Sequence, residues 1–139
     1  MFIKELTISD LFIGYKDSIS VELTMEQVDL FAKLSGDFSP IHMDESFAKE
    51  QGFTGRVAHG ALLCAYVSNL IGNRLPGRFG ILYSIELNFQ KPVVPQETLS
   101  IEGEVTAIST STGLITTKIK IKNSNEQLLA SGRVKTVVR

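Results

Sequence analysis

The stretch that decides the fold runs from Val57 to Gly72 and reads VAHGALLCAYVSNLIG. Its apolar residues cover almost the whole circumference of a helix, whereas a surface helix keeps one polar face. These residues are Ala61, Leu62, Leu63, Cys64, Ala65, Val67, Leu70 and Ile71. The pattern predicts a buried central helix surrounded by other elements. The stretch contains His59, Ser68 and Asn69 and is shorter than the about 20 residues of a membrane span, so we expect no membrane association.

The second half of the chain has the alternating pattern of β-strands. From Ile81 to Phe89 the odd positions are apolar, which predicts a strand with one buried face. Further alternating segments cover residues 99–107, 115–121 and 128–138, with turn-forming clusters at 109–113 and 123–125. Short turns between one-sided strands imply an antiparallel sheet. Together with the central helix, they predict an α+β domain whose curled antiparallel sheet wraps around the helix.

The first half is mixed in character. Residues 18–23 alternate as a short strand does, and Thr24 with Gln27 fits a capping box at the start of a helix. Gly36 stands where a left-handed residue ends such a helix. Asp44 can cap a second, short helix that runs through residue 50.

Length and composition limit the class of protein. The 139 residues suit one domain spanning 1–139. A net charge of −1 argues against a dedicated nucleic-acid binder, which usually carries a basic excess. A single cysteine excludes an internal disulfide and a multi-cysteine zinc site. No signal peptide is visible at the N-terminus, so we expect a cytoplasmic protein.

Asp37 and His42 stand five residues apart across a turn that contains Pro40. An acid and an imidazole on a rigid loop are the groups needed to hold and activate a water molecule. The alternative is that Asp37 serves the turn and His42 only packs, since aspartate is common in turns for local reasons. Asp37, His42, Asp44 and His59 show no recognised metal-ligand spacing, so we expect no metal.

His59 and Gly60 lie at the predicted start of the central helix. A helix N-terminus offers free N–H groups, and glycine lets a ligand oxygen approach the backbone closely. Such an N–H can polarise a carbonyl group during a reaction. The alternative is a glycine selected only for tight packing. Ser68 follows two turns later, where a hydroxyl more often bonds its own backbone than a ligand.

Three segments together resemble a known family. They are SGDFSPIH at residues 35–42, VAHG at 57–60 and NFQKPV at 88–93. The first two resemble the hydratase 2 motif of the R-specific enoyl-CoA hydratases, or MaoC-like dehydratases, and the third resembles that family's strand ending in Lys-Pro-Val. The resemblance implies a hotdog fold and the reversible hydration of trans-2-enoyl thioesters to (R)-3-hydroxyacyl thioesters.

The resemblance also implies roles for individual residues. Asp37 and His42 would be the catalytic pair that binds the water. The substrate-binding set would comprise the backbone N–H of Gly60 in the oxyanion hole, together with Ser39, His59 and Ser68. Ser39 departs from the pattern, because many members have asparagine there. No metal or redox cofactor is implied.

Three functions follow from this resemblance. The first is a hydratase of acyl-CoA. The second is a dehydratase of (R)-3-hydroxyacyl-[acyl-carrier-protein], for which Arg74, Arg78 and Lys91 could form a basic patch toward an acidic carrier. The third is a hotdog protein that binds acyl thioesters without reacting. In each case we expect a homodimer or an assembly of dimers, because a sheet of this size leaves an exposed edge that needs cover.

Overall fold

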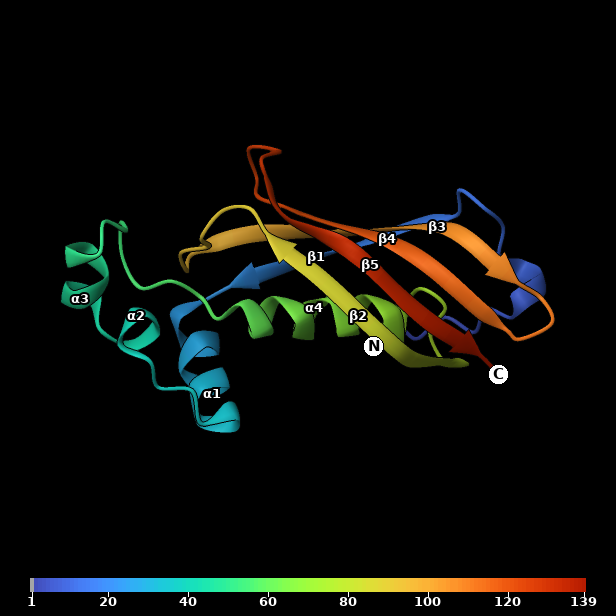
Figure 1. The fold of residues 1–139 in the computed structure, drawn as a ribbon, viewed down its shortest axis with the longest axis horizontal. Coiled ribbons are helices and arrows are strands. Elements are labelled where there is room, and N and C mark those ends of the chain that lie inside the picture. The colour runs from blue at the N-terminus through green and yellow to red at the C-terminus, as the bar shows by residue number, and fades with distance from the viewer. Residues whose placement is uncertain (1) are drawn as a thin grey trace.

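A computed structural model describes residues 2–139, and it has one five-stranded sheet in which all neighbouring strands run antiparallel. The strands are β1 (Lys16–Leu23), β2 (Gly80–Phe89), β3 (Glu97–Ser109), β4 (Leu114–Lys122) and β5 (Leu128–Val138), in the order β1-β3-β4-β5-β2. The long helix α4 (Gly60–Asn73) lies along one face of this sheet (Figure 1). The chain thus has the predicted α+β hotdog fold.

Helix α4 packs against the sheet with one face. The buried face consists of Leu62, Leu63, Tyr66, Val67, Leu70 and Ile71. It contacts the inner face of the strands, where Leu99, Ile101, Ile119 and Ile121 are fully buried. Burial of each such side chain contributes roughly 1.5–3 kcal/mol relative to exposure. Among the described residues, no helix is long and apolar enough to cross a membrane.

The prediction that other elements surround this helix is wrong for the isolated chain. Ala61, Ala65, Ser68, Asn69 and Gly72 follow one stripe along α4 and are exposed. These side chains are small or polar, so the uncovered face presents little apolar area. The helix also begins at Gly60 rather than Val57, because the preceding segment is extended and bonds to other loops: the N–H of Ala58 donates to the carbonyl of Val93.

Strand β2 is a second correction, since its apolar odd positions do not form one buried face. Its register shifts at Tyr83: before the shift Leu82 pairs with buried Thr136, and after it Ile85 pairs with buried Val134. Paired residues share a face, so the inward positions change from even to odd at this bulge. β2 is also the edge strand, and most of its large apolar side chains are exposed, namely Ile81, Leu82, Tyr83, Ile85 and Phe89.

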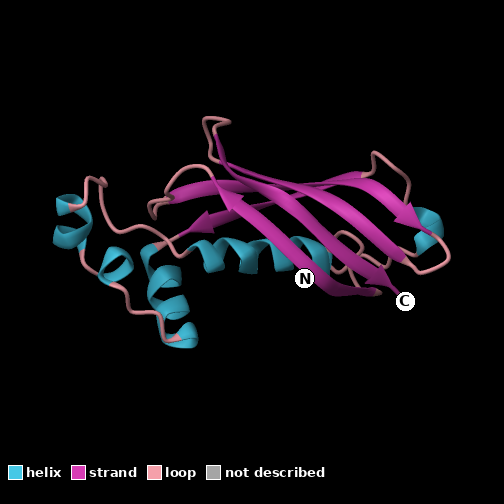
Figure 2. Cartoon of the chain, viewed as in Figure 1, coloured by secondary structure: helices cyan, strands magenta, loops and turns pink. Residues whose placement is uncertain are grey.

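Three helices, α1 (Met25–Ser35), α2 (Pro40–Met43) and α3 (Glu45–Glu50), gather at one end of the molecule beyond the sheet (Figure 2). The predicted cap at Thr24 is present, and its side chain accepts from the N–H of Gln27 at 3.2 Å. The reciprocal half of the capping box is replaced by another contact, because the Gln27 side chain accepts from the hydroxyl of Tyr66 on α4. This hydrogen bond ties α1 to the central helix.

Candidate active site

Asp37 is placed by the end of α1. Gly36 ends the helix with φ of +81°, a left-handed conformation that glycine adopts without steric cost, and so turns the chain. The N–H of Asp37 then donates to Ser35 Oγ at 3.1 Å, and Asp37 Oδ1 accepts from the N–H of Ser39 at 3.1 Å. Local hydrogen bonds of this kind are why aspartate favours turns. They leave Oδ2 free, on a side chain that is 50% exposed.

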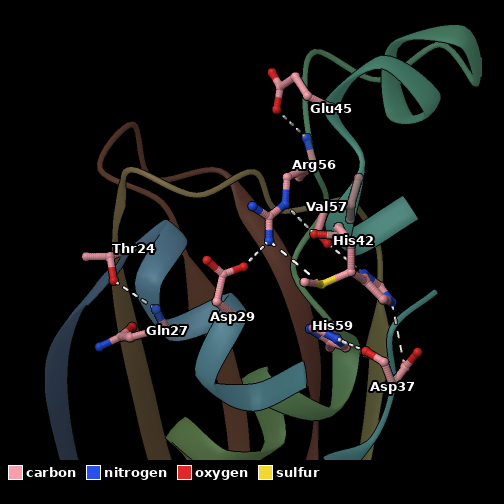
Figure 3. Close-up of polar contacts among 10 residues, drawn as sticks. Thr24, Gln27, Asp29, Asp37, His42, Glu45, Arg56, Val57 and His59 are labelled. Atoms are coloured by element: carbon pink, nitrogen blue, oxygen red, sulfur yellow. Dashed lines mark hydrogen bonds and ion pairs between the residues drawn. The ribbon is translucent and has the colours of Figure 1, made fainter. Parts of the chain in front are cut away.

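His42 lies on α2, a single helical turn that begins at Pro40, and not on a loop as the sequence predicted. Its Nδ1 lies 2.6 Å from the carbonyl oxygen of Val57. A carbonyl only accepts, so Nδ1 carries the hydrogen and Nε2 presents a lone pair. This lone pair lies 3.8 Å from Asp37 Oδ2 (Figure 3). The separation is too long for a direct hydrogen bond, and a water molecule fits within reach of both atoms.

His59 lies against both residues of this Asp37–His42 pair. Its side chain is 1% exposed. Its Nε2 lies 3.0 Å from the backbone carbonyl oxygen of Asp37, and its ring stacks on that of His42 with centroids 3.9 Å apart. A buried ring has no open path to a substrate, so its burial argues against the direct substrate contact that the resemblance implied.

Gly60 opens α4, directly after His59. No group among residues 2–139 accepts a hydrogen bond from its N–H, as expected for the first turn of a helix. Gly60 also borders a pocket of about 290 Å³, whose other walls include Val57, Ala58, Leu63, Phe89 and Lys91. A Cβ atom at position 60 would lie 2.8 Å from the outer end of the Phe89 ring, so any larger residue here would force that ring to move.

Two predicted site residues remain outside this cluster. Ser39 caps α2 with its backbone, and its hydroxyl makes no hydrogen bond within the described chain. Ser68 is exposed on α4, about 12 Å along the axis from Gly60 at 1.5 Å per residue. Cys64 lies between Gly60 and Ser68 on α4. Burial raises the pKa of its thiol, which keeps the thiol protonated.

Arg56 is the residue that the sequence analysis missed. Its Nε donates to the backbone carbonyl of His42, and its Nη2 forms an ion pair with Asp29 on α1 (Figure 3). One guanidinium thus connects the helix that carries His42 to the helix that precedes Asp37. The available signal was its isolation, because it is the only lysine or arginine between Lys49 and Arg74.

Ligating atoms of Asp37, His42 and His59 lie within 4.8 Å of one another, so this cluster must be tested as a metal site. The rings of the two histidines are stacked at 25°. The lone pairs of imidazoles lie in the ring planes, and those of nearly parallel rings do not converge on one ion. The Nε2 of His59 is also engaged by the Asp37 carbonyl. The geometry suits a water molecule between Asp37 and His42 better than a metal.

Known proteins resemble this chain in sequence over most of its length. A family model described as MaoC like domain matches residues 14–127. The chain belongs to the MaoC-like dehydratase family. Its relatives include the (R)-specific enoyl-CoA hydratase of Aeromonas caviae, 32% identical over 127 residues that cover 91% of this chain and 95% of the relative. The (R)-specific enoyl-CoA hydratase of Rhodospirillum rubrum is 36% identical over 78% of this chain and 72% of its own length.

Solved structures place this MaoC-like chain in the same group. The structure of the (R)-hydratase from A. caviae involved in PHA biosynthesis matches with a TM-score of 0.88 at 32% identity. The match covers 93% of this chain and 98% of the other. The MaoC-like fold therefore extends over nearly all of the described residues.

The expected basic patch does not form in this MaoC-like chain. Arg74 pairs with Asp17 and Arg78 pairs with Glu5, both near the end of α4 and the start of β2. Lys91 follows the far end of β2, about 30 Å away at roughly 3.3 Å per residue. It is the one lysine or arginine that borders the pocket beside Gly60.

Proposed function

We propose that this protein is a hydro-lyase that reversibly hydrates trans-2-enoyl-CoA to (R)-3-hydroxyacyl-CoA. The observation that carries the proposal is the placement of Asp37 Oδ2 and His42 Nε2, 3.8 Å apart, around a position that suits one water. The free N–H of Gly60 follows directly after His59, which contacts both residues. The names of relatives at 32% and 36% identity support the same reaction class.

The Asp37–His42 pair would activate the water. Its oxygen forms a bond to C3 of the enoyl group while the pair takes up one of its protons, and a proton from the pair reaches C2. The net change is addition of H and OH across the double bond, and the pair ends with the protons that it held at the start. General acid–base catalysis of this kind contributes about 10²–10⁴-fold to the rate.

The N–H of Gly60 would stabilise the charge that develops on the thioester oxygen as C3 is attacked. This charge is an enolate oxygen, and a donor fixed at a helix N-terminus stabilises it without reorganisation. Loss of one such donor typically costs about 2.7–4 kcal/mol of transition-state stabilisation. The thioester itself delocalises the electrons, so the mechanism uses no cofactor.

We favour coenzyme A over an acyl carrier protein as the carrier. An acidic carrier protein would be recognised by a cluster of cations, and Arg74 and Arg78 are each paired with a carboxylate. Lys91 alone lies at the pocket, where one lysine can contact a phosphate group. A binding protein without activity is disfavoured because the acid, the imidazole and the free N–H are all in place.

The working unit is proposed to be a homodimer or an assembly of dimers. Within residues 2–139, edge strand β2 has one side without a partner strand, and its exposed apolar residues include Tyr83, which is 71% exposed. Unpaired edges with apolar side chains usually meet another chain. A second copy could continue the sheet across β2.

The function is tested with a series of trans-2-enoyl-CoA esters of increasing chain length, followed by analysis of the product's configuration. We expect turnover and (R)-3-hydroxyacyl-CoA as product. Matched acyl-carrier-protein substrates measure the preference for the carrier. Binding of every ester without turnover would contradict the hydratase and favour the binding protein.

A further inference from the structure

His59 is one of only two histidines in the chain, and the other is His42. The ring of His59 lies beneath the Asp37–His42 pair and is 1% exposed. A side chain that binds substrate must reach open space, and this one does not. It makes one hydrogen bond and one stacking contact, and each of these reaches one member of the pair. These contacts indicate what the ring does.

The first contact holds Asp37. The backbone carbonyl of Asp37 only accepts, so Nε2 of His59 donates to it at 3.0 Å. Nδ1 is buried and has no hydrogen-bond partner within residues 2–139. A proton there would create an unpaired buried donor and a buried charge, both of which are costly. The contact thus places the hydrogen of the His59 ring on Nε2.

The second contact holds His42. The rings of His42 and His59 stack with centroids 3.9 Å apart and planes at 25°. Phe31 packs edge-on against the His59 ring, with centroids 4.9 Å apart. This packing limits rotation of the His42 ring about its own side-chain bond. Together with the bond from His42 Nδ1 to Val57, it directs the lone pair of Nε2 toward Asp37.

We propose that His59 is a positioning residue that sets the separation and orientation of the Asp37–His42 pair through both contacts. Its effect on turnover rests on the proposed hydratase function, whereas its effect on the geometry of His42 does not. A misplacement of about 1 Å at a reacting group can cost about 100-fold in rate. We therefore expect the loss to fall on kcat, with KM nearly unchanged.

The geometry is tested on the wild-type protein without a histidine tag, using ¹⁵N NMR of the imidazole rings. Only two rings contribute. At neutral pH we expect His59 as the Nε2–H tautomer and His42 as the Nδ1–H tautomer. A charged His59, or one that carries its hydrogen on Nδ1, would overturn the proposal without any reference to activity.

The role is tested with His59→Gln and His59→Leu. The glutamine amide can still donate to the Asp37 carbonyl from nearly the same place as Nε2, and leucine cannot. We expect His59→Leu to lose about 100-fold in kcat and His59→Gln to recover a large part of it. Asp17→Asn, which weakens the hydrogen bonds to Arg74 at the far end of α4, serves as the control for lost stability and should keep its kcat.

Equal kcat losses in His59→Gln and His59→Leu, in proportion to their lowered thermal stability, would overturn the positioning role. If His59→Leu does not fold, His59→Gln alone decides. A retained Nδ1–H tautomer of His42 with a reduced but measurable kcat supports the proposal. Full wild-type activity in His59→Gln contradicts it. An inactive wild-type enzyme contradicts the hydratase proposal instead, and the tautomers then decide the role of His59.

Discussion

Gly60→Ala adds a single methyl group and tests whether Gly60 leaves room for a ligand at the backbone or serves only tight packing. In Gly60→Ala the new Cβ would lie 2.8 Å from the outer end of the Phe89 ring, which is half exposed and can move. We expect little change in thermal stability and a fall of at least about tenfold in kcat/KM, equivalent to about 1.4 kcal/mol. The double variant Gly60→Ala/Phe89→Leu should recover part of this loss. No recovery would show that crowding of the pocket is not the cause.

Ser39 gives a second prediction for a single side chain. Its hydroxyl makes no hydrogen bond in the described chain, although it stands at the N-cap of α2. Ser39→Ala should therefore lower the free energy of unfolding by less than about 0.5 kcal/mol, whereas a bonded cap costs about 1 kcal/mol. Thr24→Ala, which removes a bonded cap, is the control. Chemical denaturation measures both, and an equal loss would contradict the assignment.

For single residues, the sequence predicted those features that depend only on neighbouring residues in the chain. The turn at Gly36 and the acid and imidazole after it could be read directly, because backbone conformation and residue type decide them. The burial of His59 and the role of Arg56 could not. Both depend on contacts between residues 14 to 27 positions apart, which no local pattern encodes.

Arg56 connects elements, so its prediction concerns α1 and α2. It donates to the carbonyl of His42 and pairs with Asp29 at the same time, which requires the fixed fork of a guanidinium. Arg56→Lys should keep the charge and lose one of the two contacts. We expect kcat to fall clearly, while the free energy of unfolding changes little. Arg78→Lys, at an exposed ion pair with Glu5, should have no effect on kcat. Equal kinetics in both variants would contradict this connecting role.

Asp17 fastens β1 to the N-terminal segment and to the end of α4. Burial alone would raise the pKa of Asp17, but hydrogen bonds from Arg74 and Lys4 outweigh it, and the pKa lies below its usual value. The stabilisation is thus complete above the ordinary aspartate pKa of about 3.9 and is lost as the pH falls through the lowered value. Asp17→Asn should destabilise the protein at neutral pH and reduce the loss of stability on acidification. Denaturation curves at several pH values measure this, and parallel acid profiles would contradict it.

The bounds of α1, α3 and the strands of the second half were predicted closely. Alternation placed β5 at its observed bounds and the other strands of the second half within two residues, since a half-buried sheet imposes a period of two. The bulge at Tyr83 and the short helix α2 were missed. A bulge depends on the partner strand, and one turn of helix is too short to show a period.

The edge at β2 sets the prediction for the whole molecule. If a second copy covers this edge, Tyr83→Lys should weaken the dimer, because a lysine at an edge opposes pairing. Thr106→Lys, at an exposed position of the interior strand β3, adds the same charge away from the edge and is the control. Light scattering should give about twice 15.3 kDa, or a multiple of that, for wild type and control. A stable, active wild-type monomer would contradict the dimer.

The hydratase proposal requires Asp37 and His42 together to add water to an enoyl thioester. Its most direct test is the steady-state hydration of crotonyl-CoA by the wild-type enzyme, Asp37→Asn and His42→Ala, after near-native folding of each variant is confirmed by circular dichroism. We predict formation of (R)-3-hydroxybutyryl-CoA by the wild type and a loss of about 10²–10⁴-fold in kcat in each variant. Wild-type kcat in either variant, or in the double variant, would contradict it.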